Sequence, residues 1–78
     1  MRGLYTPEQH IKEREKLAHE VLDFRRRYLL SQIRMAEVMK VSRRTVQMIE
    51  AGQVLPHMVT RRKFLDLKIE FAKKFRAA

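Results

Sequence analysis

The sequence describes one small, strongly basic chain. It has 78 residues, with 18 Lys and Arg against 9 Asp and Glu, a formal net charge of +9 and no cysteine. These counts exclude a disulfide scaffold and a thiolate zinc site, and no apolar run approaches the roughly 20 residues that a membrane helix needs. We expect a single domain over residues 1–78, located in the cytoplasm, with no cofactor, no metal and no membrane partner.

The positive charge lies in the last two thirds of the chain. Residues 1–24 carry a net charge of −1, whereas residues 25–52 and 53–78 each carry +5. Such a field attracts polyanions, because neutralising phosphates releases their condensed counterions. The charge distribution therefore favours nucleic acid or an acidic membrane surface as the partner, against the alternative of a basic surface that serves only solubility.

The first predicted element is a long helix from Pro7 to about Tyr28. Thr6 can cap it, Pro7 suits the first helical position, and Gln9 can complete a capping box. Arg25 projects into the middle of the apolar arc of this helix, so we expect it to pair with an acid or to reach past its neighbours. The apolar arc predicts one buried face and comprises Ile11, Leu17, Ala18, Val21, Leu22, Phe24, Tyr28 and Leu29.

Two short helices follow, joined by a tight turn. We expect Ser31 to cap a helix over residues 32–39, and Ser42 to cap a helix over residues 43–51 that Gly52 ends. Apolar residues are spaced so that these helices pack on each other, with a small alanine where they cross: Met35, Met39, Val41, Val46, Ile49 and Ala36. This arrangement predicts a helix-turn-helix unit.

The last predicted element is a helix over about Met58 to Phe75. Its apolar residues cover an arc of about 200° at 100° per residue, which is wider than one contact requires. A second buried surface in a dimer would explain this width, and so would a break into two shorter helices. Lys68 and Arg61 project into the same arc, which favours the break or side chains that reach past the apolar surface. The arc comprises Phe64, Leu65, Leu67, Ile69, Phe71, Ala72 and Phe75.

Cationic side chains recur at the beginnings of three predicted helices. A cation at this position opposes the helix macrodipole and costs a few tenths of a kcal/mol. Because the same unfavourable placement occurs in three helices, we infer that these cations bind an external anion, and phosphate is the obvious candidate. The residues concerned are Arg34 in the second helix, Arg43 and Arg44 in the third, and Arg61, Arg62 and Lys63 in the last.

Several short motifs occur in register between Leu30 and Pro56. They are Leu30-Ser31-Gln32, Met35-Ala36, Val41-Ser42-Arg43 and Ile49-Glu50-Ala51-Gly52, followed by Pro56. With Val21, Phe24 and Arg25 upstream, this pattern resembles the phage lambda repressor and Cro (Xre-like) helix-turn-helix family over a little under half of the chain. The resemblance implies an all-α, lambda repressor-like domain of four to five helices with an extended N-terminal helix and a helix-turn-helix core at about residues 31–52.

The chain also departs from the family pattern. Leu29 and Lys40 stand where the family usually has glycine, and a non-glycine residue at positive φ costs on the order of 1 kcal/mol. The helix before Phe24 is longer than the usual lead-in, and Arg61-Arg62 replaces apolar residues that are common in the fourth helix. These departures affect the expected turn geometry, the C-terminal packing and the dimer interface.

The resemblance implies roles for individual residues. It places Arg43, Arg44 and Met48 where the recognition helix faces base edges, with Gln47 and Thr45 beside them. We expect base contacts from Arg43, Arg44, Gln47 and Met48, although Met48 could instead fill the core. We expect phosphate contacts from Gln32, Arg34, Ser42, Thr45, Arg61 and Arg62, against the alternative of solvated side chains. Arg25 and Glu50 match positions where family members often form a buried ion pair.

No catalytic or metal constellation is visible, and His10, His19 and His57 lack metal spacing, so we expect no enzyme. We expect a sequence-specific regulator that binds double-stranded DNA, a repressor or autoregulator of a phage or prokaryotic mobile element. It would act as a homodimer on a near-palindromic operator with half-sites about one helical turn apart. The alternatives are an antitoxin that binds its own promoter and holds a toxin on the long first helix, or an adaptor that binds an acidic protein or RNA.

Overall fold

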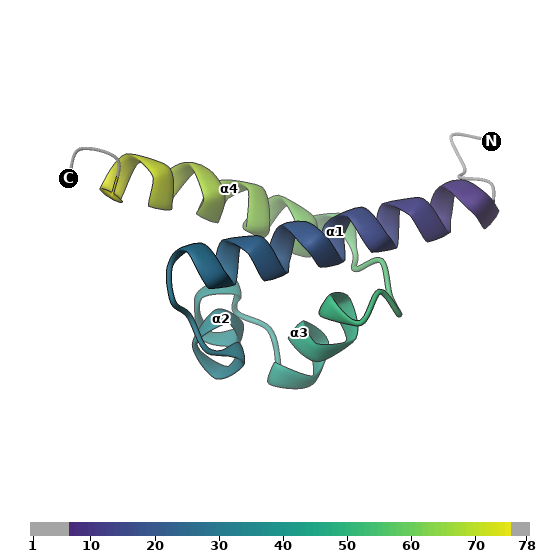
Figure 1. Cartoon of the computed structure of the whole chain (residues 1–78), viewed down its shortest axis with the longest axis horizontal. Helices are drawn as coiled ribbons and strands as arrows, with labels where there is room; N and C mark the ends of the chain where they lie inside the picture. Colours follow the sequence, from purple (N-terminus) through teal and green to yellow (C-terminus); the bar gives the residue numbers. More distant parts are fainter. Residues whose placement is uncertain (1–6, 76–78) are drawn as a thin grey trace.

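The computed structural model describes residues 7–75, which form four α-helices and no strand (Figure 1). α1 spans Pro7–Arg27, α2 Gln32–Met39, α3 Arg43–Glu50 and α4 Met58–Phe75. The predicted all-α class is confirmed, and the helix ends agree with the predicted ones within one residue. The expected cap Thr6 lies outside the described residues. None of the four helices in residues 7–75 is long and apolar enough to cross a membrane.

Serine caps begin the two short helices, as predicted. Ser31 Oγ accepts a hydrogen bond from the Arg34 amide at 3.0 Å, and Ser42 Oγ accepts one from the Thr45 amide at 3.1 Å. Each cap satisfies one of the amide groups that lack a carbonyl partner in a first helical turn.

The first three helices end in the same way. One or two positions after each helix end, a residue lies in the left-handed region, with φ of 56° at Leu29, 60° at Lys40 and 71° at Gly52. The amide of the next residue then donates to the carbonyl five positions back, in the pairs Leu30–Arg25, Val41–Ala36 and Gln53–Met48, at 2.8 to 3.0 Å. This is the Schellman arrangement. Leu29 and Lys40, the two positions at which the chain departs from an expected glycine, therefore adopt the left-handed conformation that glycine takes most readily.

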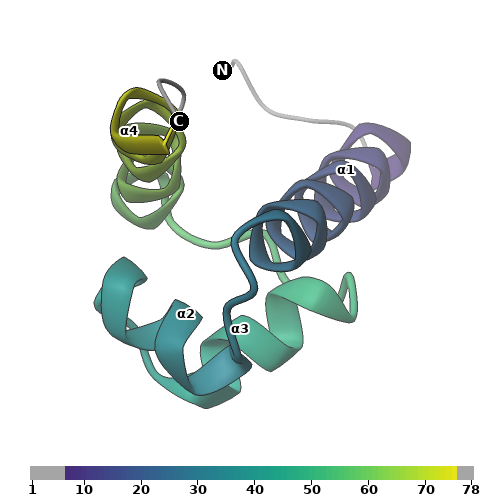
Figure 2. The ribbon, with the colours of Figure 1, turned by 60° about the vertical axis from the view of Figure 1, so that its left-hand side comes forward.

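The helices form two layers, with α1 and α4 on one side and α2 and α3 on the other (Figures 1 and 2). The core lies between them and draws residues from every helix. The most deeply buried side chains are Val21, Met35, Met39, Val46, Ile49 and Phe64. The residues predicted to pack the two short helices together are thus in the core, with Val41 only partly buried.

Aromatic rings join the second half of α1 to α4. The ring centroid of Phe24 lies 4.9 Å from Tyr28, 5.6 Å from Phe64 and 5.0 Å from Phe71. Tilted and edge-on pairs of this kind add to the free energy gained by burying each ring. This cluster holds the C-terminal end of α1 and the residue after it against α4.

Several predicted core residues are exposed instead. Ile11 is 46% exposed because the first turns of α1 extend beyond the other helices (Figure 1), and Leu29 is 92% exposed because the chain has already left the helix there. On α4, Leu65 and Ile69 are 51% and 57% exposed. The break considered for this helix was wrong, since α4 continues from Met58 to Phe75.

Candidate nucleic-acid interface

Arg43 and Arg44 open α3 and lie on the protein surface. Ser42 caps the helix immediately before them, and its hydroxyl also lies 2.9 Å from Thr45 Oγ1. Both arginines are exposed, and neither side chain forms a hydrogen bond or ion pair with any other residue in 7–75. Two guanidinium groups at the beginning of a short helix are therefore free to meet an external anion or a base edge.

Arg25 and Glu50 form the ion pair that the family resemblance implies. Arg25 Nε lies 2.7 Å from Glu50 Oε2, and Arg25 Nη2 lies 3.2 Å from Glu50 Oε1. The Glu50 side chain is 9% exposed and the Arg25 side chain 23%. Arg25 Nη1 also donates to the Leu30 carbonyl at 3.1 Å. Because this pair joins α1 to the end of α3 and to the loop before α2, it fixes the direction of α3 relative to the rest of the domain.

Gln32 belongs to the same polar network. Its Nε2 donates to Glu50 Oε1 at 3.0 Å, and its Oε1 accepts from Gln47 Nε2 at 3.4 Å. An expected phosphate contact, Gln32, is thus brought beside an expected base contact, Gln47. The sequence reasoning missed the bond between Gln32 and Glu50. The expected Arg25–Glu50 pair was a usable signal, because a partly buried carboxylate with one partner needs further donors.

The other predicted contacts in α2 and α3 differ in their surroundings. Arg34 is exposed and pairs with Glu37 at 2.9 Å, a surface pair of the kind that contributes between 0 and about 1 kcal/mol to stability. Thr45 and Met48 are half-buried, so each offers only part of its side chain to a ligand. These three residues remain available to an anion or a base, but less freely than Arg43 and Arg44.

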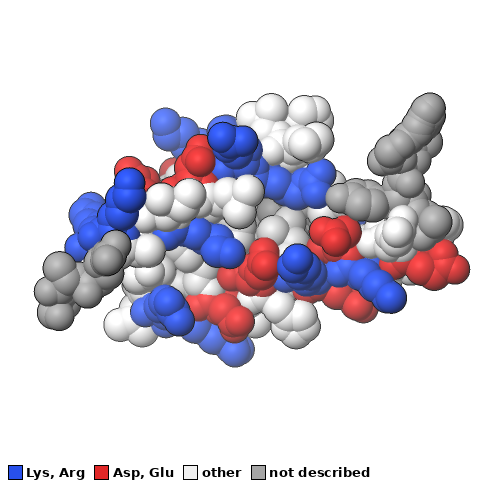
Figure 3. All heavy atoms as spheres, turned by 90° about the horizontal axis from the view of Figure 1, so that it is seen from above, with Lys and Arg blue, Asp and Glu red and all other residues white. Residues whose placement is uncertain are grey.

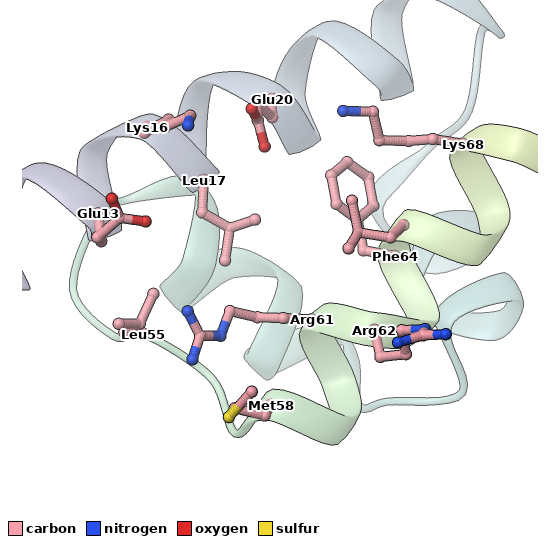
Figure 4. A pocket seen from close by; sticks show the side chains of 11 residues that line it. Glu13, Lys16, Leu17, Glu20, Leu55, Met58, Arg61, Arg62, Phe64 and Lys68 are labelled. Atoms are coloured by element: carbon pink, nitrogen blue, oxygen red, sulfur yellow. The ribbon is translucent and has the colours of Figure 1, made fainter. Parts of the chain in front are cut away.

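Arg61 lies elsewhere. Figure 4 shows its side chain directed toward Leu55 in a groove between α1 and α4, and its Nε is buried without a hydrogen-bond partner among the described residues. The groove has a volume of about 750 Å³ and is lined by no residue of α3. Arg62, at its edge, is exposed and lies 3.6 Å from Asp66. We therefore leave Arg61 and Arg62 out of the candidate interface, since their side chains belong to the α1–α4 side of the molecule.

Charge differs between the two sides of the molecule. Over the face of α1 and α4, acidic and basic side chains are interspersed (Figure 3). In residues 28–52, by contrast, the bases are Arg34, Lys40, Arg43 and Arg44, all exposed, and Glu37 is the one exposed acid. The surface of α2 and α3 is thus the more uniformly positive of the two.

The candidate interface consists of the exposed side chains of α2 and α3 around Arg43 and Arg44. Gln47 is exposed one turn further along α3, and Arg34 is exposed in the first turn of α2. The Arg25–Glu50 pair holds α3 from the other side. Comparison of the chain with protein-family models, with curated proteins and with solved structures gave no match.

Proposed function

We propose that the protein binds double-stranded DNA sequence-specifically, as a helix-turn-helix regulator of the lambda repressor and Cro type, with α3 in the major groove. The observation that carries this proposal is the exposure of Arg43 and Arg44, unpaired among the described residues, at the beginning of α3. An arginine fork matches the O6 and N7 acceptors of guanine, and a helix start directed at the groove is the docking mode of such units.

The structure of the α2–α3 unit supports this proposal. Its helices have eight residues each, both begin at a serine cap, and α2 ends in a tight left-handed turn at Lys40. The polar network of Arg25, Glu50, Gln32 and Gln47 holds α3 against α1 and α2. A reading helix must be held rigidly, since loss of alignment would cost the paired hydrogen bonds on which base discrimination depends.

The proposed biological role is that of a repressor or autoregulator that acts by occupying its operator. This role rests on the family resemblance of residues 30–56. An adaptor that binds RNA through the same basic surface makes a different prediction, because the deep and narrow major groove of an RNA duplex does not admit side chains for reading base edges.

Selection of bound duplexes from a random-sequence DNA pool tests the proposal. The purified protein should enrich a defined motif that is retained against excess non-specific duplex. A variant with Arg43→Gln and Arg44→Gln should lose the motif. A matched control with Arg26→Gln and Arg27→Gln changes the net charge equally at two other exposed, adjacent arginines and should keep it.

Four results would overturn the proposal. Three are the absence of any motif with the unaltered protein, an unchanged motif with the Arg43 and Arg44 variant, and a preference for RNA of any sequence over DNA in competition. The fourth is binding that falls to the same extent with both double variants, because it would show a general polyanion surface instead of a helix that contacts base edges.

A further inference from the structure

The groove between α1 and α4 has the size and the lining of a site for a small molecule. Its volume of about 750 Å³ lies within the range of about 300–1,000 Å³ that ligand pockets usually have. Such pockets combine apolar walls with a few polar groups that fix the orientation of the ligand. The apolar residues of the groove come from α1, from the loop before α4 and from α4 itself, and they are Leu17, Leu55, Met58, Phe64 and Leu65 (Figure 4).

The charges in the groove are not balanced, since its lining contains two acids and four bases. Two of the bases have neighbours that stabilise them. Lys68 Nζ lies 5.5 Å from the centre of the Phe64 ring, and Arg62 Nε lies 3.6 Å from Asp66 Oδ1. Arg61 has no such neighbour. Its Nε is buried without a hydrogen-bond partner, and its side chain forms no ion pair with any residue in 7–75.

The half-buried guanidinium of Arg61 needs an anion, because burying a charge is unfavourable unless the charge is paired. A carboxylate suits it, since its two oxygens match the guanidinium fork. A phosphate monoester suits it less well, because it carries more than one negative charge at neutral pH. Glu13 and Glu20, on the α1 side of the groove, would repel the additional charge (Figure 4).

We propose that the groove binds a small organic acid that consists of an apolar body and one carboxylate. The apolar body packs between Leu17 on α1 and Phe64 on α4, and the carboxylate accepts hydrogen bonds from the Arg61 guanidinium. No residue of α3 lines the groove, so Arg43 and Arg44 stay accessible while the acid is bound. The proposal accounts for an arginine that lies apart from the candidate DNA interface and has no partner among the described residues.

NMR titration of the isotope-labelled protein tests the proposal without DNA, so its outcome is independent of the proposed DNA binding. The probes are octanoate and, in a separate titration, phenylbutyrate. At least one of these acids should shift the backbone amide signals of Leu17, Leu55 and Phe64 in a saturable way. The corresponding alcohols, octanol and phenylbutanol, should bind about tenfold more weakly, because they cannot form the charge-assisted hydrogen bonds to Arg61.

Two further probes separate the parts of the proposed ligand. Acetate has the carboxylate without the apolar body, and octylammonium has the apolar body with the opposite charge. Neither should saturate the shifts of the groove residues, since each lacks one of the two contacts.

A first pair of variants tests the carboxylate contact. Arg61→Gln should raise the dissociation constant of the bound acid about tenfold or more, because it removes the guanidinium that holds the carboxylate. Arg26→Gln is the matched control, since it changes the net charge equally at an exposed arginine of α1 outside the groove. It should leave the dissociation constant unchanged.

A second pair tests the apolar contact. Leu65 lines the groove and is 51% exposed, whereas Ile69, on the same helix, does not line it and is 57% exposed. Leu65→Gln should therefore weaken binding of the acid, and Ile69→Gln should not. Circular dichroism should show the same helix content for both variants, because both positions are exposed.

Several outcomes would overturn the proposal. One is that neither acid gives saturable shifts at the groove residues. Another is that Arg61→Gln leaves the dissociation constant unchanged, or raises it no more than Arg26→Gln does, because the acid would then respond only to the general positive charge of the chain. Alcohols that bind as tightly as the acids would show an apolar cleft without an anion site. This comparison uses the unaltered protein, so it decides the question even if Arg61→Gln lowers the helix content.

Discussion

The Arg25 guanidinium in α1 donates to both carboxylate oxygens of Glu50 at the end of α3, across 25 residues of sequence. Glu50 accepts a third hydrogen bond from Gln32 at the beginning of α2. One carboxylate, 9% exposed, thus gathers donors from the two helices on either side of it. It holds the helix that carries Arg43 and Arg44 in a single orientation, which links the stability of the fold to the geometry of the candidate interface.

The two side chains of this pair should be energetically coupled, so that removing both costs less stability than the sum of removing each alone. Arg25→Met leaves a nearly buried carboxylate with one donor, and we expect a loss of about 2–3 kcal/mol in the free energy of unfolding. Glu50→Leu leaves the guanidinium with only the Leu30 carbonyl and should cost a similar amount. The double variant should lose clearly less than the sum of the two, measured by urea denaturation. Strictly additive losses would show that the two side chains are not coupled.

Leu29 and Lys40 have left-handed backbone conformations although neither is glycine, so replacing either with glycine should stabilise the fold. A left-handed conformation costs a residue with a side chain roughly 1–2 kcal/mol, and glycine avoids this cost. Part of the gain is lost because glycine makes the unfolded chain more flexible. Leu29→Gly and Lys40→Gly should therefore each raise the free energy of unfolding by about 0.5–1 kcal/mol. Leu29 loses little packing in the exchange because it is 92% exposed.

The third Schellman turn allows the reverse substitution, from glycine to a residue with a side chain, as a control. Gly52 has φ of 71°, and a Cβ added there would meet no atom within 4 Å. Gly52→Ala should thus reduce stability by about 1 kcal/mol through the backbone alone. If Gly52→Ala were neutral, or Lys40→Gly destabilising, the left-handed assignment at the corresponding turn would be wrong.

Each α3 arginine should contribute separately to DNA reading. Arg43→Ala or Arg44→Ala should weaken binding to the selected site by about 1–3 kcal/mol and relax the preference at one base pair. Arg27→Ala, at an exposed position in the last turn of α1, is the control and should leave the base preference unchanged. Affinities of each variant for a panel of DNA sites that differ by one base pair would show whether the base preference has relaxed. Equal weakening on every sequence would mean that the arginines contact only phosphate.

Glu37 should oppose DNA binding. It is the exposed acid on the α2–α3 surface, and it holds Arg34 in a pair at 2.9 Å. Glu37→Gln frees Arg34 for phosphate and removes a negative charge, so affinity for DNA should rise about threefold to tenfold at low salt and rise less at high salt. Stability should change by less than about 0.5 kcal/mol because the pair is exposed. An unchanged affinity at low salt would remove Arg34 from the interface.

Local signals were enough to predict the helices. Serine caps, a left-handed glycine and the period of apolar residues act within a few neighbouring positions, so Ser31, Ser42 and Gly52 mark helix ends without reference to the rest of the chain. The need of Arg25 for a partner also follows from its own helix, because a cation inside an apolar arc must be neutralised or reach water. The choice of Glu50 as that partner came from the family resemblance.

Tertiary structure decided what depends on how the helices cross and where the core ends. Leu29 and Ile11 share the apolar arc of α1 yet lie in solvent, because the chain turns at Leu29 and no other helix reaches Ile11. Arg61 was grouped with the interface arginines by its place near a helix start, but the angle between α1 and α4 directs it into their groove. Sequence periodicity specifies the side of a helix on which a residue lies. Only the packing of all four helices specifies what that side faces.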